Sequence, residues 1–348
     1  VSYNSFHEQA KKLKLDLERQ SNTPNQQDLQ RLMLLLARMQ QMLVSPNLAK
    51  LGAEYFKKHP IEVERAAQHE TGALVTLHNL VVQLQADGHA HVIVACNHVE
   101  LMKIARKYMS LKGDIDASRD VGDIFLYDGT LTLPQRQTVR TQFLSADKSV
   151  LFLSVGAGGT GLHLVPSSPE TREEAEFCRA MIFWGSRPFS PQQVWQTLKR
   201  IHRIGQRFKC YIHHLIAYGS VDYAINCVHE DKSGLANAVI DDDWSNCDQL
   251  GGNWRQKGRI VDMCCPLMED GNFPTPIDGV VVPPAHHTTA KSSIAGPAGL
   301  QPVAALQSQF FRGPLHQAGG GGSQVNMGAL FANPPAAVSY THLTLPTT

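Results

Sequence analysis

The sequence predicts an α/β protein with a mostly parallel sheet, helices on both faces of that sheet, a helical segment before it and a disordered tail after it. Between residues 91 and 228, short apolar runs of strand length alternate with segments of helical periodicity. Only helical periodicity occurs upstream, and the sequence after Asp278 contains no acidic residue. Strands that alternate with helices form parallel sheets covered on both faces, and their active edge lies at the carboxyl ends of the strands.

Three amphipathic helices are expected before the sheet. The first is basic and spans Lys11 to Arg19. The second ends before Pro46, because proline cannot continue a helix, and the third ends near Gly88. The apolar residues of the second and third recur at helical spacing: Leu29, Leu32, Met33, Leu36, Met39 and Leu43, then Leu74, Leu77, Val81 and Leu84.

The alternating region provides the strands and helices of the sheet. The expected strands are His91–Cys96, Ile124–Tyr127, Val150–Ser154, Ala180–Trp184 and Cys210–Ile216. The expected helices are Glu100–Met109, Pro134–Leu144, Pro191–Arg200 and Val221–Val228.

The composition excludes several classes of protein. No apolar run approaches the ~20 residues of a membrane-spanning helix, and no signal sequence opens the chain. The seven cysteines lack a repeated spacing, which argues against a disulfide scaffold and for a reducing compartment. The net charge of +1 excludes a purely electrostatic nucleic-acid binder, so any such contact needs a local basic surface. No metal site is expected, because the pairs Cys264-Cys265, His213-His214 and His286-His287 lack the spacing of zinc ligands.

The tail 279–348 is expected to be disordered. Its only formal charges are Lys291 and Arg312, and it contains paired prolines and the glycine run 319–322. Such a composition cannot bury enough apolar surface to offset the entropy of ordering the chain. Residues 339–348 resemble translated cloning or adaptor sequence, and we exclude them from the expected fold.

A glycine-rich loop follows the strand that ends at Ser154. Its glycines Gly156, Gly158 and Gly161 match the spacing GxGxxG. A dinucleotide site also needs a helix that opens at the glycines and an acidic residue about 20 positions later. Pro166 cuts that helix short and the next strand ends without an acidic residue, so the dinucleotide interpretation is disfavoured. A simple tight turn remains an alternative.

The segment from Gln196 to Gln206, with the sequence QTLKRIHRIGQ, carries the strongest signal. Arg200 and Arg203 are three residues apart and share one face if the helix continues. Two planar guanidinium groups suit the spread charge of a transferring phosphoryl group. The alternative is a solvated basic helix end, which would complement the helix dipole. The preceding glycine loop and the Ile-Gly-Gln ending favour the phosphate interpretation.

These blocks resemble a family: the C-terminal RecA-like lobe of Swi/Snf-type helicase-like ATPases, within helicase superfamily two. Gln196–Gln206 is similar to the family's motif VI, QxxxRxHRIGQ, and Val150–Leu164 is similar to its motif V. Tyr127 to Thr130, followed by Arg136 and Phe143, resembles the segment that lies between the earlier motifs. The resemblance covers about residues 29 to 232 and implies a RecA-like fold.

The resemblance also implies roles for individual residues. Arg200 and Arg203 would reach ATP phosphates, with Gln196 nearby, and the glycines Gly158, Gly159 and Gly161 would approach the nucleotide. DNA-backbone contacts would come from Ser154, Gly129, Thr130 and Arg136. Thr130 has the alternative of capping a turn, and Arg136 that of lying in solvent. ATP and Mg²⁺ would be held mainly by a first lobe, since the chain contains neither GxxxxGK[ST] nor an Asp-Glu pair.

The implied function is the second motor lobe of an ATP-dependent double-stranded DNA translocase or chromatin remodeller. Its expected partners are double-stranded DNA, with nucleosomes as a candidate, and the N-terminal RecA-like lobe of the same protein. The protein would be nuclear in a eukaryote and cytoplasmic otherwise, and neither secreted nor in a membrane. One alternative is an RNA helicase lobe of the DEAD-box kind, which Gln206 disfavours. Another is a non-catalytic, helicase-like interaction module, because Val155, Gly156 and His163 replace the threonine, arginine and asparagine of the motif V pattern.

Four regions are expected along the chain. Residues 1–60 form a helical segment at the end of the first lobe or in its protrusion, and residues 61–235 form the RecA-like lobe. Residues 236–278 are an irregular extension, and residues 279–348 are the tail.

Overall fold

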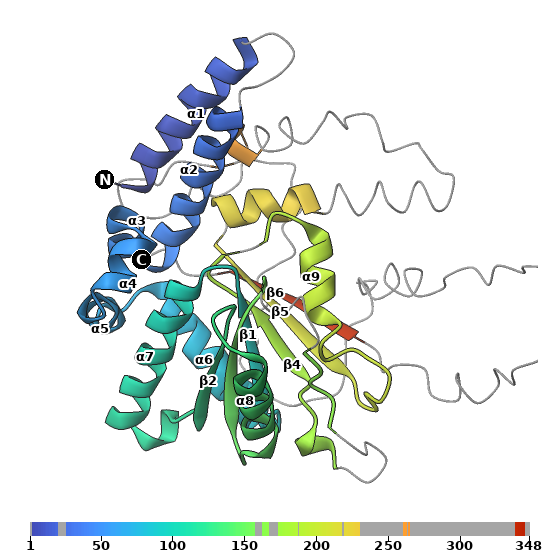
Figure 1. Cartoon of the computed structure of the whole chain (residues 1–348). Coiled ribbons are helices and arrows are strands. Elements are labelled where there is room, and N and C mark those ends of the chain that lie inside the picture. Colours follow the sequence, from blue (N-terminus) through green and yellow to red (C-terminus); the bar gives the residue numbers. More distant parts are fainter. Residues whose placement is uncertain are drawn as a thin grey trace, which may run out of the picture.

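The computed structural model describes residues 2–19, 26–156, 162–166, 173–186, 188–217, 219–229, 260–262, 264 and 338–344 (Figure 1). The predicted strands are present as β1 (His91–Cys96), β2 (Asp123–Tyr127), β3 (Ser149–Ser154), β4 (Ala180–Phe183) and β5 (Cys210–Ile216). A further strand, β6 (Val338–Thr344), extends the sheet to the order β2-β3-β1-β4-β5-β6. All the pairings are parallel, which confirms the predicted α/β class.

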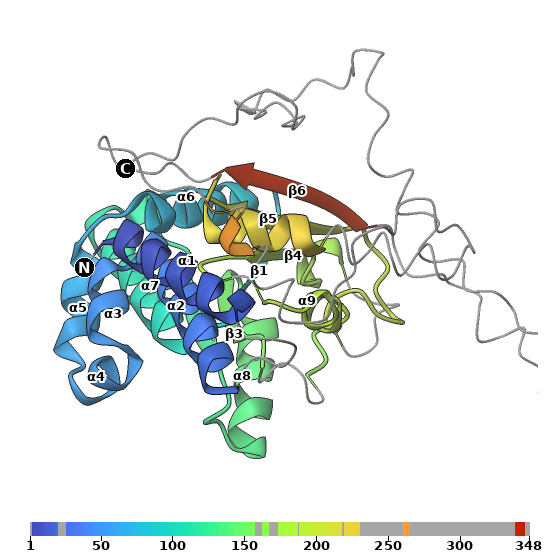
Figure 2. The ribbon, with the colours of Figure 1, turned by 90° about the horizontal axis from the view of Figure 1, so that it is seen from above.

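The central strands are buried on both faces. In β1, Val92 and Val94 point into one hydrophobic cluster, and Ile93 and Ala95 point into another. The first cluster is covered by α6 (Gly72–Ala86) and α7 (Val99–Ile115). The second is covered by α8 (Leu133–Ser145) and α9 (Pro191–Leu198) (Figure 2). This two-sided burial explains the continuous apolar runs in the sequence.

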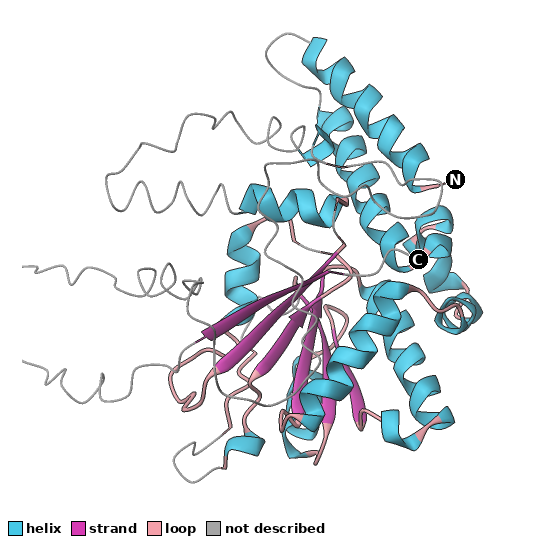
Figure 3. Cartoon of the chain, turned by 180° about the vertical axis from the view of Figure 1, so that it is seen from behind, coloured by secondary structure: helices cyan, strands magenta, loops and turns pink. Residues whose placement is uncertain are grey.

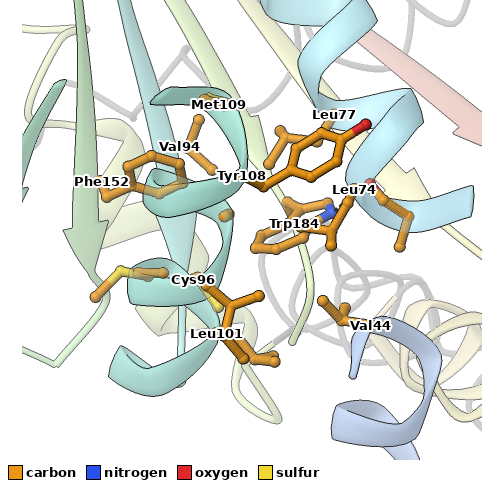
Figure 4. Close-up of a cluster of buried hydrophobic side chains, with 14 of the residues drawn as sticks. Val44, Leu74, Leu77, Val94, Cys96, Leu101, Tyr108, Met109, Phe152 and Trp184 are labelled. Atoms are coloured by element: carbon orange, nitrogen blue, oxygen red, sulfur yellow. Dashed lines mark hydrogen bonds between the residues drawn. The ribbon is translucent and has the colours of Figure 1, made fainter. Parts of the chain in front are cut away.

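Trp184 fixes the end of β4. Its backbone amide donates to Ala95 O (3.0 Å), and its indole Nε1–H donates to Ala73 O (3.0 Å). The buried ring packs among side chains of α6, α7 and α2 (Gln26–Val44), including Leu74, Leu101 and Val44 (Figure 4). The Trp184 side chain therefore packs the end of β4 against α2, α6 and α7.

A helical unit lies beyond one end of the strands (Figure 3). It consists of α1 (Tyr3–Arg19), α2 and the helix 221–229, which share a core that includes Leu17, Leu36 and Ile225. Buried polar groups connect this unit to the sheet, since Gln40 Nε2 donates to Asp222 Oδ1 (2.7 Å) and Ser186 Oγ donates to Gln40 Oε1 (3.0 Å). The predicted boundary at residue 60 stays a prediction.

Three short helices that the sequence did not indicate follow α2. They are α3 (Pro46–Leu51), α4 (Ala53–Lys58) and α5 (Ile61–Gln68). Pro46 opens α3 instead of only ending α2, because Ser45 accepts the Leu48 amide (3.3 Å) as the N-cap. In the described part of the chain, no helix combines the length and apolar character needed to cross a bilayer.

The tail departs from the expectation at one segment. Residues 338–344 pair along their whole length with β5, from Cys210 opposite Val338 to Ile216 opposite Thr344. This pairing was not expected for residues 339–344, and the foreign origin of 339–348 stays a prediction. The segment VSYTHLT is rich in β-branched and aromatic residues, and an edge strand offers free backbone groups to such a sequence. The rest of the predicted tail lies outside the described residues.

We expect Gly122→Ala to destabilise the chain strongly. Gly122 precedes β2 with a φ of +72°, and an added Cβ would lie 2.2 Å from Lys148 O, a backbone atom that cannot move cheaply. The matched control is Gly88→Ala, where φ is +88° but nothing lies within 4 Å of the added Cβ. The control carries only the positive-φ strain of about 1 kcal/mol. In urea unfolding, Gly122→Ala should cost about 2 kcal/mol more than the control. Equal costs would contradict this account.

Candidate functional site

The helix that carries the predicted arginines is shorter than expected. α9 ends at Leu198, and tight turns follow: the Arg200 amide donates to Thr197 O (3.0 Å) and the Ile201 amide to Leu198 O (3.1 Å). The predicted helix therefore extends two residues beyond α9, and Ile201, after these turns, is buried in the core. Arg200 and Arg203 lie in these turns and not on one helical face.

Arg200 connects two parts of the site. Its carbonyl accepts the Leu164 amide (3.2 Å), and its Nη1 donates to Leu162 O (3.5 Å). Its Nε is buried without a hydrogen-bond partner among the described residues. Burial and the nearby Arg203 charge lower the pKa of Arg200, while Tyr127 acts in the opposite direction. The guanidinium is thus half-buried, close to another cation and only partly satisfied.

Arg203 is exposed and belongs to a cluster of three arginines. Its charge and that of Arg140 lower the pKa of His163, after the larger effect of burial. Within the described ranges, none of Arg140, Arg200 and Arg203 forms an ion pair with a carboxylate. We call these three residues the arginine cluster. It presents uncompensated positive charge beside residues 162–166.

The two glutamines of the predicted motif have different environments. Gln196 is exposed on α9. Gln206 is buried: its Nε2 donates to Cys178 O (3.2 Å) and Ile201 O (3.3 Å), and its Oε1 accepts the Phe208 amide (3.2 Å). Gln206, which disfavoured the DEAD-box alternative in the sequence, therefore closes the turn after α9.

The loop after β2 holds the next predicted residues. Asp128 is buried and its Oδ1 accepts the Thr130 amide (2.8 Å) and the Thr130 hydroxyl (2.6 Å). Asp128 thus caps this turn and holds Thr130 in it, while the predicted DNA contact of Thr130 stays a prediction. Arg136 Nε donates to Leu131 O (2.9 Å), and its guanidinium lies 5.6 Å from the centre of the Tyr127 ring. Gly129 is exposed with open space around it.

The loop after β3 begins beside the loop after β2, because the two strands are neighbours in the sheet. Ser154 is buried, and the Val155 amide continues the sheet by donating to Cys96 O (3.1 Å). The Val155 side chain belongs to the second core cluster, so this departure from the motif V pattern fills the core. Gly156 is exposed, and a Cβ added there would have nothing within 4 Å. Gly158, Gly159 and Gly161 lie outside the described residues.

The structure therefore brings together two groups of predicted residues. Gly129, Thr130, Arg136 and Ser154 lie at the carboxyl ends of β2 and β3, and Arg200 and Arg203 lie with residues 162–166. Tyr127 lies between these groups, since it contacts Arg136 and interacts electrostatically with Arg200. Arg140 was not among the predicted site residues. The sequence shows it only as a basic residue on the helix after β2. In the described ranges, no three His, Cys, Asp or Glu side chains group so as to hold a metal ion.

Comparison with known proteins places these features in context. No family model matches the chain. The DNA repair and recombination protein RAD54-like of Drosophila erecta is 25% identical over 177 residues, which are 50% of this chain and 20% of that protein. The transcriptional regulator ATRX homolog of Drosophila melanogaster is 28% identical over 207 residues, which are 55% of this chain and 15% of that protein. The chain thus spans about a fifth or less of the length of these relatives.

The chain is also similar to solved structures. The C-terminal part of the Fun30 ATPase domain matches 65% of this chain and 84% of its own, with 18% identity and a TM-score of 0.41. The C-terminal domain of the Sulfolobus solfataricus SWI2/SNF2 ATPase matches 75% of this chain and 90% of its own, with 14% identity and a TM-score of 0.42. The sequence relatives bear out the resemblance that the motifs carry.

The two glutamines give a matched stability test. We expect Gln206→Ala to lower the free energy of unfolding by about 2 kcal/mol, because it leaves buried carbonyl and amide groups unpaired. Gln196→Ala, at an exposed helical position, should change it by less than about 0.5 kcal/mol. Urea unfolding of both variants measures the difference. Gln206→Ala as stable as Gln196→Ala would mean that the buried hydrogen bonds do not hold the turn.

Proposed function

We propose that this chain, a divergent relative of Swi/Snf-type helicase-like ATPases, is the second motor lobe of an ATP-dependent double-stranded DNA translocase or chromatin remodeller. The observation that carries the proposal is the arginine cluster, in which Arg200 and Arg203 lie beside residues 162–166 without a carboxylate partner in the described ranges. Positive charge that is partly desolvated and unpaired suits a polyphosphate better than it suits solvent.

Phosphoryl transfer depends on positioned cations more than on a nucleophilic side chain. In this proposal Arg203, which is exposed, reaches the ATP phosphates directly, and Arg200 adds the free donors of its half-buried guanidinium. Gln196 and the backbone of Gly158, Gly159 and Gly161 complete the nucleotide side of the site. No three His, Cys, Asp or Glu side chains of the described residues group so as to hold a metal ion, so this proposal assigns ATP and Mg²⁺ mainly to the first lobe.

The proposed DNA contacts use the loops after β2 and β3. Gly129 and Gly156 leave space for a phosphate to approach the backbone. Thr130 and Arg136 shape the first loop through Asp128 and Tyr127, and Ser154 ends the strand beside it. Contacts of this kind position DNA without selecting its sequence. The expected partners are double-stranded DNA, nucleosomes and the protein's own first lobe, and the expected location is the nucleus.

A non-catalytic interaction module is the second candidate. It is favoured by Val155, whose side chain is buried in the core where the motif V pattern has a threonine. Loss of that hydroxyl would weaken the coupling between nucleotide and DNA. Activity of the full-length protein distinguishes the two candidates.

We expect Arg203→Lys, in the full-length protein with its own first lobe, to lower DNA-stimulated ATP turnover by about 10³-fold or more. Lysine keeps the charge but loses the planar fork that binds two phosphate oxygens. DNA affinity should change by less than about twofold, because the contact is to nucleotide. The measurements are steady-state hydrolysis and DNA binding at several salt concentrations.

Arg207→Lys is the matched control, since it makes the same change four residues later at an exposed position. It should leave turnover near the wild-type value. If Arg203→Lys instead hydrolyses ATP normally and loses DNA affinity, Arg203 contacts the DNA backbone and the site assignment fails.

The chain alone should not hydrolyse ATP above background, with or without DNA. Its arginines can stabilise charge only on a nucleotide that another lobe holds in place. A phosphate-release assay with the purified chain tests this expectation. Steady, DNA-stimulated turnover by the chain would contradict the two-lobe proposal.

A further inference from the structure

Residues 162–165 are held from two sides. Arg140 on α8 donates through Nε to His163 O and through Nη2 to Val165 O (3.3 Å). On the other side, the Leu164 amide donates to Arg200 O (3.2 Å). The backbone beneath His163 is therefore fixed between α8 and the turns after α9.

A backbone contact within this segment decides which ring nitrogen of His163 carries the proton. Its Nδ1 accepts the Val165 amide (3.4 Å), so the neutral ring carries its proton on Nε2. The charged groups that face the ring are Arg203 from the turns after α9 and Arg140 from α8, and no described carboxylate opposes them. Burial and these two charges lower the pKa of His163 below its usual value near 6.5. At pH 7 the side chain is a neutral donor through Nε2–H.

We propose that His163 is a third phosphate-contacting residue of this site, which donates Nε2–H to a polyphosphate oxygen near Arg203, and that Arg140 is the positioning residue that orients it. This inference rests on the proposed function and deepens it. The motif V pattern has asparagine at this position. The side-chain oxygen of asparagine can likewise accept a hydrogen bond from the Val165 N–H, and its NH₂ group can donate to a ligand. The imidazole differs because it can also take up a proton.

Uptake of a proton by His163 on polyphosphate binding is the effect that an experiment can measure. A bound polyphosphate offsets the two arginine charges and stabilises the imidazolium form, so it raises the pKa of His163. Binding is then coupled to protonation, and affinity rises as the pH falls from about 7.5 towards 6. With asparagine at this position that contribution is absent, and only protonation of the phosphate groups themselves, whose pKa is about 6, changes the affinity.

The first experiment is an NMR pH titration of the histidine rings of the chain, with and without tripolyphosphate. Without it, the His163 pKa should lie below 6.5, with the proton of the neutral ring on Nε2. With saturating tripolyphosphate, the pKa should rise by about 0.5 or more. His69 is the internal control, because it ends α5 on the opposite side of the sheet from α8, and its titration should not change. An unchanged His163 titration at saturation would overturn the inference.

Variants test the two roles separately. His163→Asn should bind tripolyphosphate at pH 7.5 within about twofold of the wild type and lose the part of the pH dependence that the imidazole adds, whereas His163→Leu should bind about tenfold more weakly. Arg140→Lys keeps the charge but cannot hold both carbonyls, so it should weaken binding in the wild type and have a smaller effect in His163→Leu. Additive effects would overturn the positioning role of Arg140.

Failure of this inference can be told from failure of the proposed function. If tripolyphosphate binding is lost in Arg203→Gln but has the same strength and the same pH dependence in His163→Leu as in the wild type, the arginines contact phosphate and His163 does not. If tripolyphosphate binding does not depend on Arg203, both proposals are wrong.

Discussion

The two-sided burial of the central strands is the constraint on which the rest of the structure depends. β1, β3 and β4 have no exposed residue, so each needs a helix layer on both faces. A parallel sheet meets this need only if the chain crosses over between successive strands, and the crossovers are α7, α8 and α9. All the carboxyl ends then meet at one edge. The loops that carry Gly129, Ser154 and Gly156 are neighbours for this reason.

At the same edge, buried polar groups join the sheet to the helical unit. Gln40 both accepts from Ser186 and donates to Asp222, so no member of this chain of hydrogen bonds is left unpaired. A buried polar group costs free energy unless it is paired, and this network fixes how α2 and the helix 221–229 meet the sheet. His98 is half-buried with an unpaired Nε2, and His213 is buried with neither ring nitrogen paired among the described residues. Burial lowers the pKa of each to about 4, so both stay neutral.

Much of this fold could be predicted, because hydrophobic periodicity decides burial. The expected strand His91–Cys96 matches β1 at both ends, and the expected strand Ala180–Trp184 extends one residue beyond β4. The sequence could not show that α9 ends at Leu198, since Ile201 enters the core by turns that no local propensity requires. It also gave no sign that Gln206 and Arg140 form hydrogen bonds to carbonyls distant in the sequence. β6 was missed for a similar reason, because an edge strand is defined by its partner.

The arginine cluster is unfavourable for folding alone, and this bears on what it does. Burial and the neighbouring Arg203 charge lower the pKa of Arg200. Its Nε has no hydrogen-bond partner among the described residues. Carbonyls of residues 162, 163 and 165 compensate in part, but a carbonyl carries only a partial charge. In the proposed function a polyanion would supply what is missing, and its binding would stabilise the folded chain by mass action. A surface lysine-rich face would be solvated and would gain little, whereas desolvated, preorganised guanidinium groups gain most from a ligand with several phosphate oxygens. The arrangement of charge, burial and unpaired donors therefore favours a phosphate-binding role over a solvated basic helix end.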